Sequence, residues 1–125
     1  MKKAVVIALA LVMVALFAGC GLQSQLAGTK WEQVQESGLA KAILTLSFEK
    51  GNEYKESYDM YYDGTFLAED SYSNTGKWAV DGDELTITYL DSVSFTYRVE
   101  IDGDTLKLFD SDDDSYYYPF TRVKE

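Results

Sequence analysis

A chain of 125 residues with a net charge of −10 is long enough for one compact domain, and its acidity argues against partners that present phosphates. Lys2 and Lys3 precede an apolar leader, so of the 11 basic residues nine remain against 21 acidic ones, a net charge of −12. With no His and a single Cys, the chain lacks the usual zinc or copper ligands, a disulfide, and any His-dependent nucleophile. We therefore expect no nucleic-acid binding, no cofactor or metal and no catalytic residues, and a carboxylate-based enzyme is the least favoured class.

The first residues follow the three-part pattern of a secretory signal. Lys2 and Lys3 form a short basic start, an apolar run covers residues 4–17, and small residues follow it. The run is shorter than the roughly 20 residues that span a bilayer as a helix. We predict that residues 1–19 are a signal peptide, helical while it acts and then cleaved.

The segment ends on Phe17, Ala18, Gly19 and Cys20, which resemble the bacterial lipobox, although Leu is more usual at the position of Phe17. The resemblance implies that Cys20 becomes an acylated N-terminus, carrying chains such as palmitate, and that residues 20–27 are a lipidated tether. Such chains hold a protein on a membrane at about 0.8 kcal/mol per buried CH₂. The implied location is the cell envelope outside the cytoplasm, and the outer membrane in a Gram-negative host, because Gly21 is not the Asp that retains lipoproteins at the inner membrane. The alternative is an ordinary signal peptide that leaves a free thiol.

The rest of the chain has the alternation of β-strands rather than the periodicity of helices. Ten Tyr, six Phe and two Trp supply material for a packed interior. Asp-Gly pairs at positions 63, 81 and 102 favour tight hairpin turns between successive strands. Residues 38–42 are predicted to hold at most one helical turn, and Pro119 to lie at an edge or bulge. The predicted strands cover residues 29–35, 42–49, 53–62, 65–71, 76–81, 85–89, 95–101, 106–108 and 116–120.

Hairpins without long crossovers favour up-and-down order, and closure removes the two free edges of an open sheet. From these eight or nine short strands we predict an all-β domain over residues 28–125, an antiparallel up-and-down barrel of eight strands.

This pattern resembles the small lipocalin-like domains of bacterial lipoproteins, which belong to the calycin group. Gly28-Thr29-Lys30-Trp31 is similar to the motif that opens the first lipocalin strand, although Trp31 lies one residue farther from Gly28 than usual. The resemblance implies that Arg122 covers Trp31 at a closed end of the barrel. In the alternative interpretation Trp31 is a core aromatic and Arg122 a surface charge.

Three groups of side chains are candidates for a binding site. Residues 110–114 alternate oxygen ligands as a calcium loop does, but the Gly and Glu later in that loop are missing, so an acidic hairpin is favoured. The acidic residues Glu53, Glu56, Asp59 and Asp63 are interpreted as a solvated face. Tyrosines cluster at 54–72 and 116–118, where they either line a mouth or partner surface or simply pack on strands. For a ligand site we predict Tyr58, Trp78, Tyr89, Tyr97 and Tyr118.

We expect a membrane-anchored, noncatalytic lipoprotein that binds a small apolar or amphipathic molecule. The alternative is a protein-interaction module, such as an inhibitor or envelope assembly factor, with a solid core. A carrier predicts an open apolar cavity of about 300 Å³ or more. A filled interior with an exposed aromatic patch would favour a protein partner.

Overall fold

Strands make up most of the described chain, which comprises residues 21–110 and 116–124 of a computed structural model. The predicted signal peptide, Cys20 and its lipobox, and residues 111–114 of the candidate calcium loop lie outside this part. The elements are β2 (Thr29–Ser37), β3 (Ala40–Glu49), β4 (Glu53–Tyr62), β5 (Thr65–Phe66), the 3₁₀ helix η1 (Ala68–Asp70), β6 (Tyr72–Asp81), β7 (Glu84–Tyr89), β8 (Ser94–Asp102), β9 (Thr105–Phe109) and β10 (Tyr118–Arg122).

Eight of these strands form a closed barrel in chain order. Each pairs with the next in antiparallel fashion, in the order β2, β3, β4, β6, β7, β8, β9 and β10. The last strand returns to the first, with Arg122 opposite Trp31 and Thr121 opposite Glu32. The short β5 pairs only with the end of β4. The prediction of an all-β, antiparallel, up-and-down eight-stranded barrel is therefore confirmed.

Alternation of side chains places the core inside the barrel. On β7, Leu85 and Ile87 are buried while Glu84 is exposed, and on β6 the buried Trp78 stands between exposed neighbours. Apolar area removed from water stabilises such a core by roughly 25 cal/mol per Å². The core consists of Leu22, Leu26, Trp31, Leu46, Phe48, Tyr54, Trp78, Leu85, Ile87, Val99, Leu106, Leu108 and Phe120.

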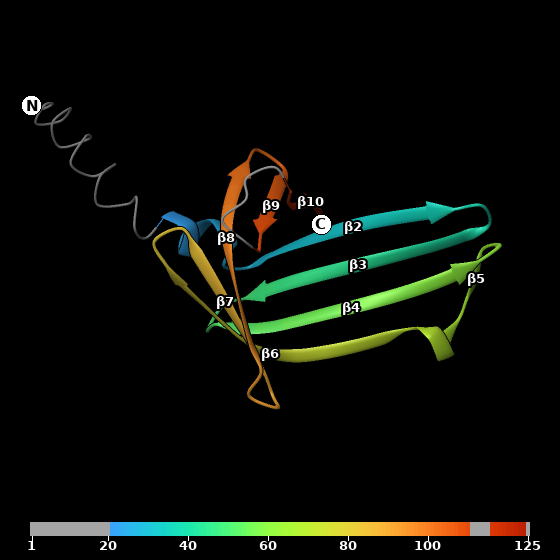
Figure 1. The fold of residues 1–125 in the computed structure, drawn as a ribbon, viewed down its shortest axis with the longest axis horizontal. Coiled ribbons are helices and arrows are strands. Elements are labelled where there is room, and N and C mark those ends of the chain that lie inside the picture. Colours follow the sequence, from blue (N-terminus) through green and yellow to red (C-terminus); the bar gives the residue numbers. More distant parts are fainter. Residues whose placement is uncertain (1–20, 111–115, 125) are drawn as a thin grey trace, which may run out of the picture.

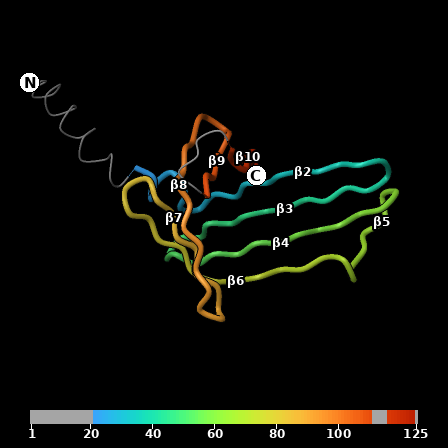
Figure 2. The backbone as a smooth tube through the Cα atoms, in the orientation of Figure 1, coloured from blue at the N-terminus to red at the C-terminus, as the bar shows by residue number. Residues whose placement is uncertain are grey.

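The barrel has one long side and one short side. The strands β2, β3, β4 and β6 have nine or ten residues each, whereas β7, β9 and β10 have five or six. In Figure 1 these four strands run side by side well past the rest, and in Figure 2 the orange trace of β8 crosses them steeply. The long strands thus continue beyond the barrel as a four-stranded sheet, which we call the extension.

Several local predictions differ from the structure, among them the last strand, which was predicted at 116–120 and is observed at Tyr118–Arg122. Residues 65–71 do not form a barrel strand: only Thr65–Phe66 pairs as a strand, because the chain then turns through η1 at the end of the extension. Ser71 closes this turn, accepting a hydrogen bond from the Met60 amide and donating one to the Leu67 carbonyl. The strand predicted at 76–81 begins earlier, at Tyr72. Residues 38–42 hold no helical turn, since Gly38 at φ 61° supports a tight turn between β2 and β3.

The segment predicted to be a tether belongs in part to the folded body. Residues 21–26 are helical, Leu26 is completely buried and Leu22 nearly so, and both join the core. The prediction that the domain starts at Gly28 missed this helix because six residues are too few to show a helical period. The two leucines, four residues apart, lie on one face of the helix. Within residues 21–110 and 116–124, no helix has the length and apolar character needed to cross a membrane.

Trp31 and Arg122 meet at this same end of the barrel. The Trp31 ring is fully buried, its Nε1 donates to Thr29 Oγ1 at 2.8 Å, and the Arg122 guanidinium lies 4.4 Å from its centroid. Asp104 in turn pairs with Arg122 Nε and Lys124 Nζ, and the hydrogen bond from Lys124 lowers the pKa of the Asp104 carboxyl. The structure thus contains the contact that the lipocalin resemblance implies, a cation–π stack that covers the closed end.

Candidate functional site

The open end of the barrel contains a small cavity. Its volume is about 180 Å³, and Leu46, Ile87, Leu108 and Phe120, all buried, form its base. This is smaller than the 300 Å³ expected of a carrier, yet the interior is not solid. A cavity of roughly 150 Å³ can hold a benzene-sized group. Tyr54 is equally buried, and the remaining lining residues are Gln33, Leu44, Glu56, Tyr89, Tyr97 and Tyr118.

A carboxylate is the most polar group of this lining. Tyr54 Oη donates to Glu56 Oε1 at 2.6 Å, and Tyr89 Oη donates to the same oxygen at 2.7 Å. Asn74 Nδ2 donates to Oε2 at 3.2 Å. All three donors are uncharged, so the cluster keeps the carboxylate in the cavity without neutralising it.

The two tyrosine hydroxyls stay protonated over a wide pH range. Burial, followed by the hydrogen bond to Glu56, raises the pKa of both Tyr54 and Tyr89 well above the usual range. Burial also raises the pKa of Tyr72 and Tyr97, with the negative charge of Glu56 as the next cause. The phenols therefore act here as hydrogen-bond donors.

These pKa shifts predict a loss of stability in alkali. A raised folded-state pKa stabilises the fold below the unfolded tyrosine pKa of about 10, and this contribution falls as the pH rises above that value. For Tyr54 the free energy of unfolding should fall by about 1.4 kcal/mol per pH unit above about pH 10. Urea denaturation between about pH 8 and about pH 11 measures it. Tyr54→Phe should show a shallower fall and Tyr62→Phe, at an exposed position, the wild-type fall; equal slopes in all three would refute the assignment.

A second carboxylate lies near the mouth. Tyr118 Oη donates to Asp110 Oδ2 at 2.8 Å, and this hydrogen bond is the main cause that raises the pKa of Tyr118 to about 12. The negative charge of Asp110 also contributes to the raised pKa of Tyr97. The mouth is therefore acidic on both sides, with Glu56 from β4 and Asp110 after β9.

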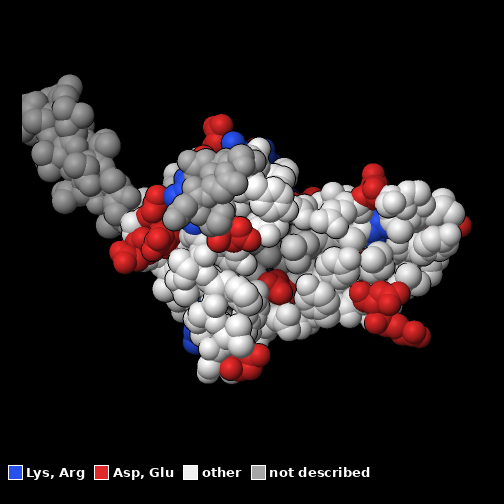
Figure 3. Space-filling model, in the orientation of Figure 1, with Lys and Arg blue, Asp and Glu red and all other residues white. Residues whose placement is uncertain are grey.

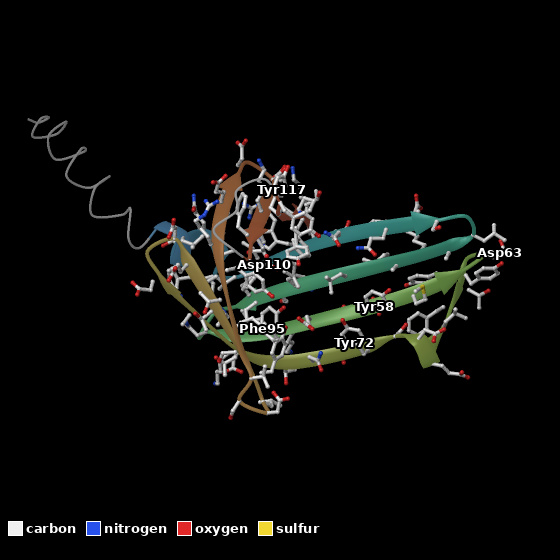
Figure 4. All side chains as sticks on the ribbon, viewed as in Figure 1. Tyr58, Asp63, Tyr72, Phe95, Asp110 and Tyr117 are labelled. Atoms are coloured by element: carbon white, nitrogen blue, oxygen red, sulfur yellow. The ribbon has the colours of Figure 1, made fainter. Side chains whose placement is uncertain are left out.

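The inner face of the extension continues from the cavity. Tyr54 and Glu56 point inward, so alternation places Tyr58, Met60 and Tyr62 on the same face of β4. Tyr58 stacks on Tyr72 of β6 with ring centroids 5.2 Å apart, and Figure 4 shows both on the face of the sheet that the view presents. In Figure 3 this face is largely uncharged, with acidic side chains mainly at its edges. We call Ala42, Tyr58, Met60, Tyr62 and Tyr72 the extended inner face.

The structure brings together only part of the predicted ligand-binding set. Tyr89, Tyr97 and Tyr118 line the cavity. Tyr58 lies beyond it, on the extended inner face. Trp78 does not line the cavity: only 1% of its surface is exposed, its Nε1 donates to the Glu49 carbonyl, and it packs edge-on against Phe48. A strongly apolar residue in the middle of a strand is more often core than site, as here.

The predicted ligand set did not include Tyr54, which belonged to the tyrosine cluster at 54–72, or Glu56. Glu56 was grouped with Glu53 and Asp59 as one solvated face, but strand alternation separates them. Glu53 and Asp59, at odd positions of β4, lie on the outer face, whereas Glu56 shares the inner face with Tyr54 and Tyr58. The spacing Tyr-x-Glu-x-Tyr at residues 54–58 was the sequence feature that could have predicted a shared inner face.

No group of three or more potential metal ligands occurs among residues 21–110 and 116–124. The calcium hypothesis for 110–114 concerns mostly residues beyond that part, and it stays a hypothesis.

Comparison with known families agrees with this architecture. A family model of the lipocalin-like domain matches residues 26–108. The chain belongs to this family. No curated protein matches the sequence. The crystal structure of the Cpx pathway activator NlpE from Escherichia coli is similar to this lipocalin-like chain, with 24% sequence identity and a TM-score of 0.49 over 66% of this chain and 42% of that one. The lipocalin-like chain thus spans less than half the length of that neighbour.

Proposed function

We propose that this chain is a lipid-anchored, noncatalytic protein of the cell envelope whose lipocalin-like barrel binds a small amphipathic molecule. The observation that carries the proposal is the 180 Å³ cavity at one end of the barrel, next to which the extended inner face lies on the same strands. The base of the cavity is apolar and its mouth is polar. Such a combination of apolar walls and a few convergent polar groups is typical of ligand sites.

The size of the cavity limits what it encloses. It has room for one group of about benzene size, so a longer molecule must leave its remainder outside. Tyr58, Met60 and Tyr72 offer partly exposed apolar and aromatic surface for that remainder. The ligand would therefore insert one end and lay the other along the extension.

The location follows from the sequence of the leader. Residues 1–19 would be removed and Cys20 acylated, which would place the barrel on the outer side of a membrane, the outer membrane in a Gram-negative host. The helix at 21–26 bears on the geometry of such an anchor. Because Leu22 and Leu26 are buried in the closed end, the lipid would attach beside that end, and the open end would point away from the attachment point.

The noncatalytic assignment rests on composition. The chain has no His and one Cys, so the commonest general base is missing. Glu56 accepts hydrogen bonds from two tyrosines and one asparagine. These bonds stabilise the charge of the carboxylate and activate no nucleophile.

Native mass spectrometry of the full chain purified from its own host tests this function. The wild type should carry a reproducible small-molecule adduct. Leu44→Trp, which places an indole in the cavity lining, should lose it, while Ile43→Trp, on the outer face of the same strand, should retain it. Far-ultraviolet circular dichroism checks that both variants fold. Wild-type protein without any adduct, or an adduct retained by Leu44→Trp, would contradict the proposal.

A protein partner is the second candidate, and one surface patch favours it. Leu90, Val93 and Phe95 around the turn from β7 to β8 are 80%, 45% and 49% exposed. Contiguous exposed apolar side chains often mark interaction sites. In this case a protein should co-purify in a fixed ratio, and Leu90→Ser combined with Phe95→Ser should release it.

A further inference from the structure

We propose that the cavity selects small organic cations, such as protonated primary amines attached to an apolar group, through the carboxylate of Glu56. This inference rests on the proposed function and names the chemistry of the group that the cavity receives.

The carboxylate of Glu56 has no counter-ion among the described residues. Carboxylates on the outer face of the same region have lysine partners: Glu53 pairs with Lys77, and Glu49 with Lys55. The residues that line the cavity include this one acid and no Lys or Arg. A half-buried charge without a counter-ion is costly, and a ligand cation would offset that cost.

The Glu56 carboxylate also keeps hydrogen-bonding capacity for a ligand. A carboxylate offers about four acceptor positions, and Tyr54, Tyr89 and Asn74 occupy three of them. The longest of these bonds, 3.2 Å, goes to Oε2. An ammonium N–H can take the remaining position, and the two tyrosine bonds already hold the carboxylate in place to receive it.

Aromatic rings surround the Glu56 carboxylate. The rings of Tyr54 and Tyr89 meet edge to face with centroids 6.0 Å apart, and Tyr97 and Tyr118 complete the lining. Tyrosine rings attract cations through their faces. Asp110, which accepts a hydrogen bond from the Tyr118 hydroxyl, adds a second negative charge near the mouth. An anionic ligand would be repelled by the two carboxylates, and a neutral ligand would gain only the apolar and aromatic contact of the lining.

Isothermal titration calorimetry of the full chain in a nonionic detergent, with a protein-free micelle blank, tests the inference. The probes are 2-phenylethylammonium and its neutral counterpart 2-phenylethanol, which share one ring and differ in charge. The variant is Glu56→Gln, which keeps the shape and removes the charge. The matched control is Glu53→Gln, on the outer face of the same strand, which changes the net charge by the same amount.

We expect the wild type and Glu53→Gln to bind the ammonium at least about tenfold more tightly than the alcohol, a difference of about 1.4 kcal/mol. Glu56→Gln should abolish this preference and leave affinity for the alcohol within about twofold. Equal affinity of the wild type for both probes would overturn the cation inference and leave small-molecule binding intact. Failure of both probes to bind, together with purification free of any adduct, would overturn the proposed function as well. The comparison of the two probes on the wild type decides the matter even if Glu56→Gln fails to fold.

Discussion

Replacing Trp31 with alanine is expected to lower the free energy of unfolding by about 3–5 kcal/mol. The ring is fully buried and belongs to the same core cluster as Leu26 and Phe48. Its removal would leave a cavity at the closed end and would take away the surface on which the Arg122 guanidinium stacks. Urea denaturation of the full chain, followed by far-ultraviolet circular dichroism, measures the loss.

Two milder variants separate the contributions at this end. Trp31→Phe retains most of the packing but loses the hydrogen bond to Thr29, so it should cost about 1–2 kcal/mol. Arg122→Lys keeps the charge but loses the planar stack, and it should cost less than about 1 kcal/mol. A loss below about 1 kcal/mol for Trp31→Ala would mean that this ring does not close the barrel.

The second large effect is expected for Gly76→Ala, which should cost about 3 kcal/mol, the upper part of the range for overpacking. A Cβ atom at this position would lie 2.2 Å from the Thr88 carbonyl oxygen and 3.1 Å from the Tyr89 Cα, both in the backbone of the neighbouring strand β7. The strands would have to separate, because no flexible side chain is available to move. The same urea titration measures the effect.

Gly76 also shapes the site. It pairs with Tyr54 on one side and Tyr89 on the other, so a residue without a side chain separates the two tyrosines that bond Glu56. Gly76→Ala should therefore weaken ligand binding in addition to stability. Gly21→Ala is the control, because nothing lies within 4 Å of its Cβ position. Similar stability of these two alanine variants would show that the backbones of β6 and β7 leave room for a Cβ atom at Gly76.

The local features of the sequence predicted most of the strands because each strand exposes one face. Apolar and polar residues alternate along β7 and β8, and Asp-Gly pairs precede or follow them, so these strands were found from a few neighbouring residues. The prediction failed at 65–71, where alternating residues belong to a turn with η1 rather than a strand. It also failed at Leu22 and Leu26, because six helical residues are too few to show a period.

The site was harder to predict than the strands. Tyr89, Tyr97 and Tyr118 come from three different strands, and only closure of the barrel brings them into one cavity. Trp78 is likewise an aromatic residue on a strand, but it is buried deeper in the barrel. Glu56 looked like a surface charge because its acidic neighbours in sequence are surface charges, although its position on β4 is an inner one.

The sequence by itself determined the class of fold, the antiparallel hairpin order and the family resemblance, because alternation and turn chemistry are local properties of the chain. Only the tertiary structure decided that the interior keeps a cavity of 180 Å³, that four strands extend beyond the barrel, and that Glu56 faces inward between two tyrosines. These features depend on strand lengths and register around a closed sheet, where a shift of one residue exchanges the inner and outer faces.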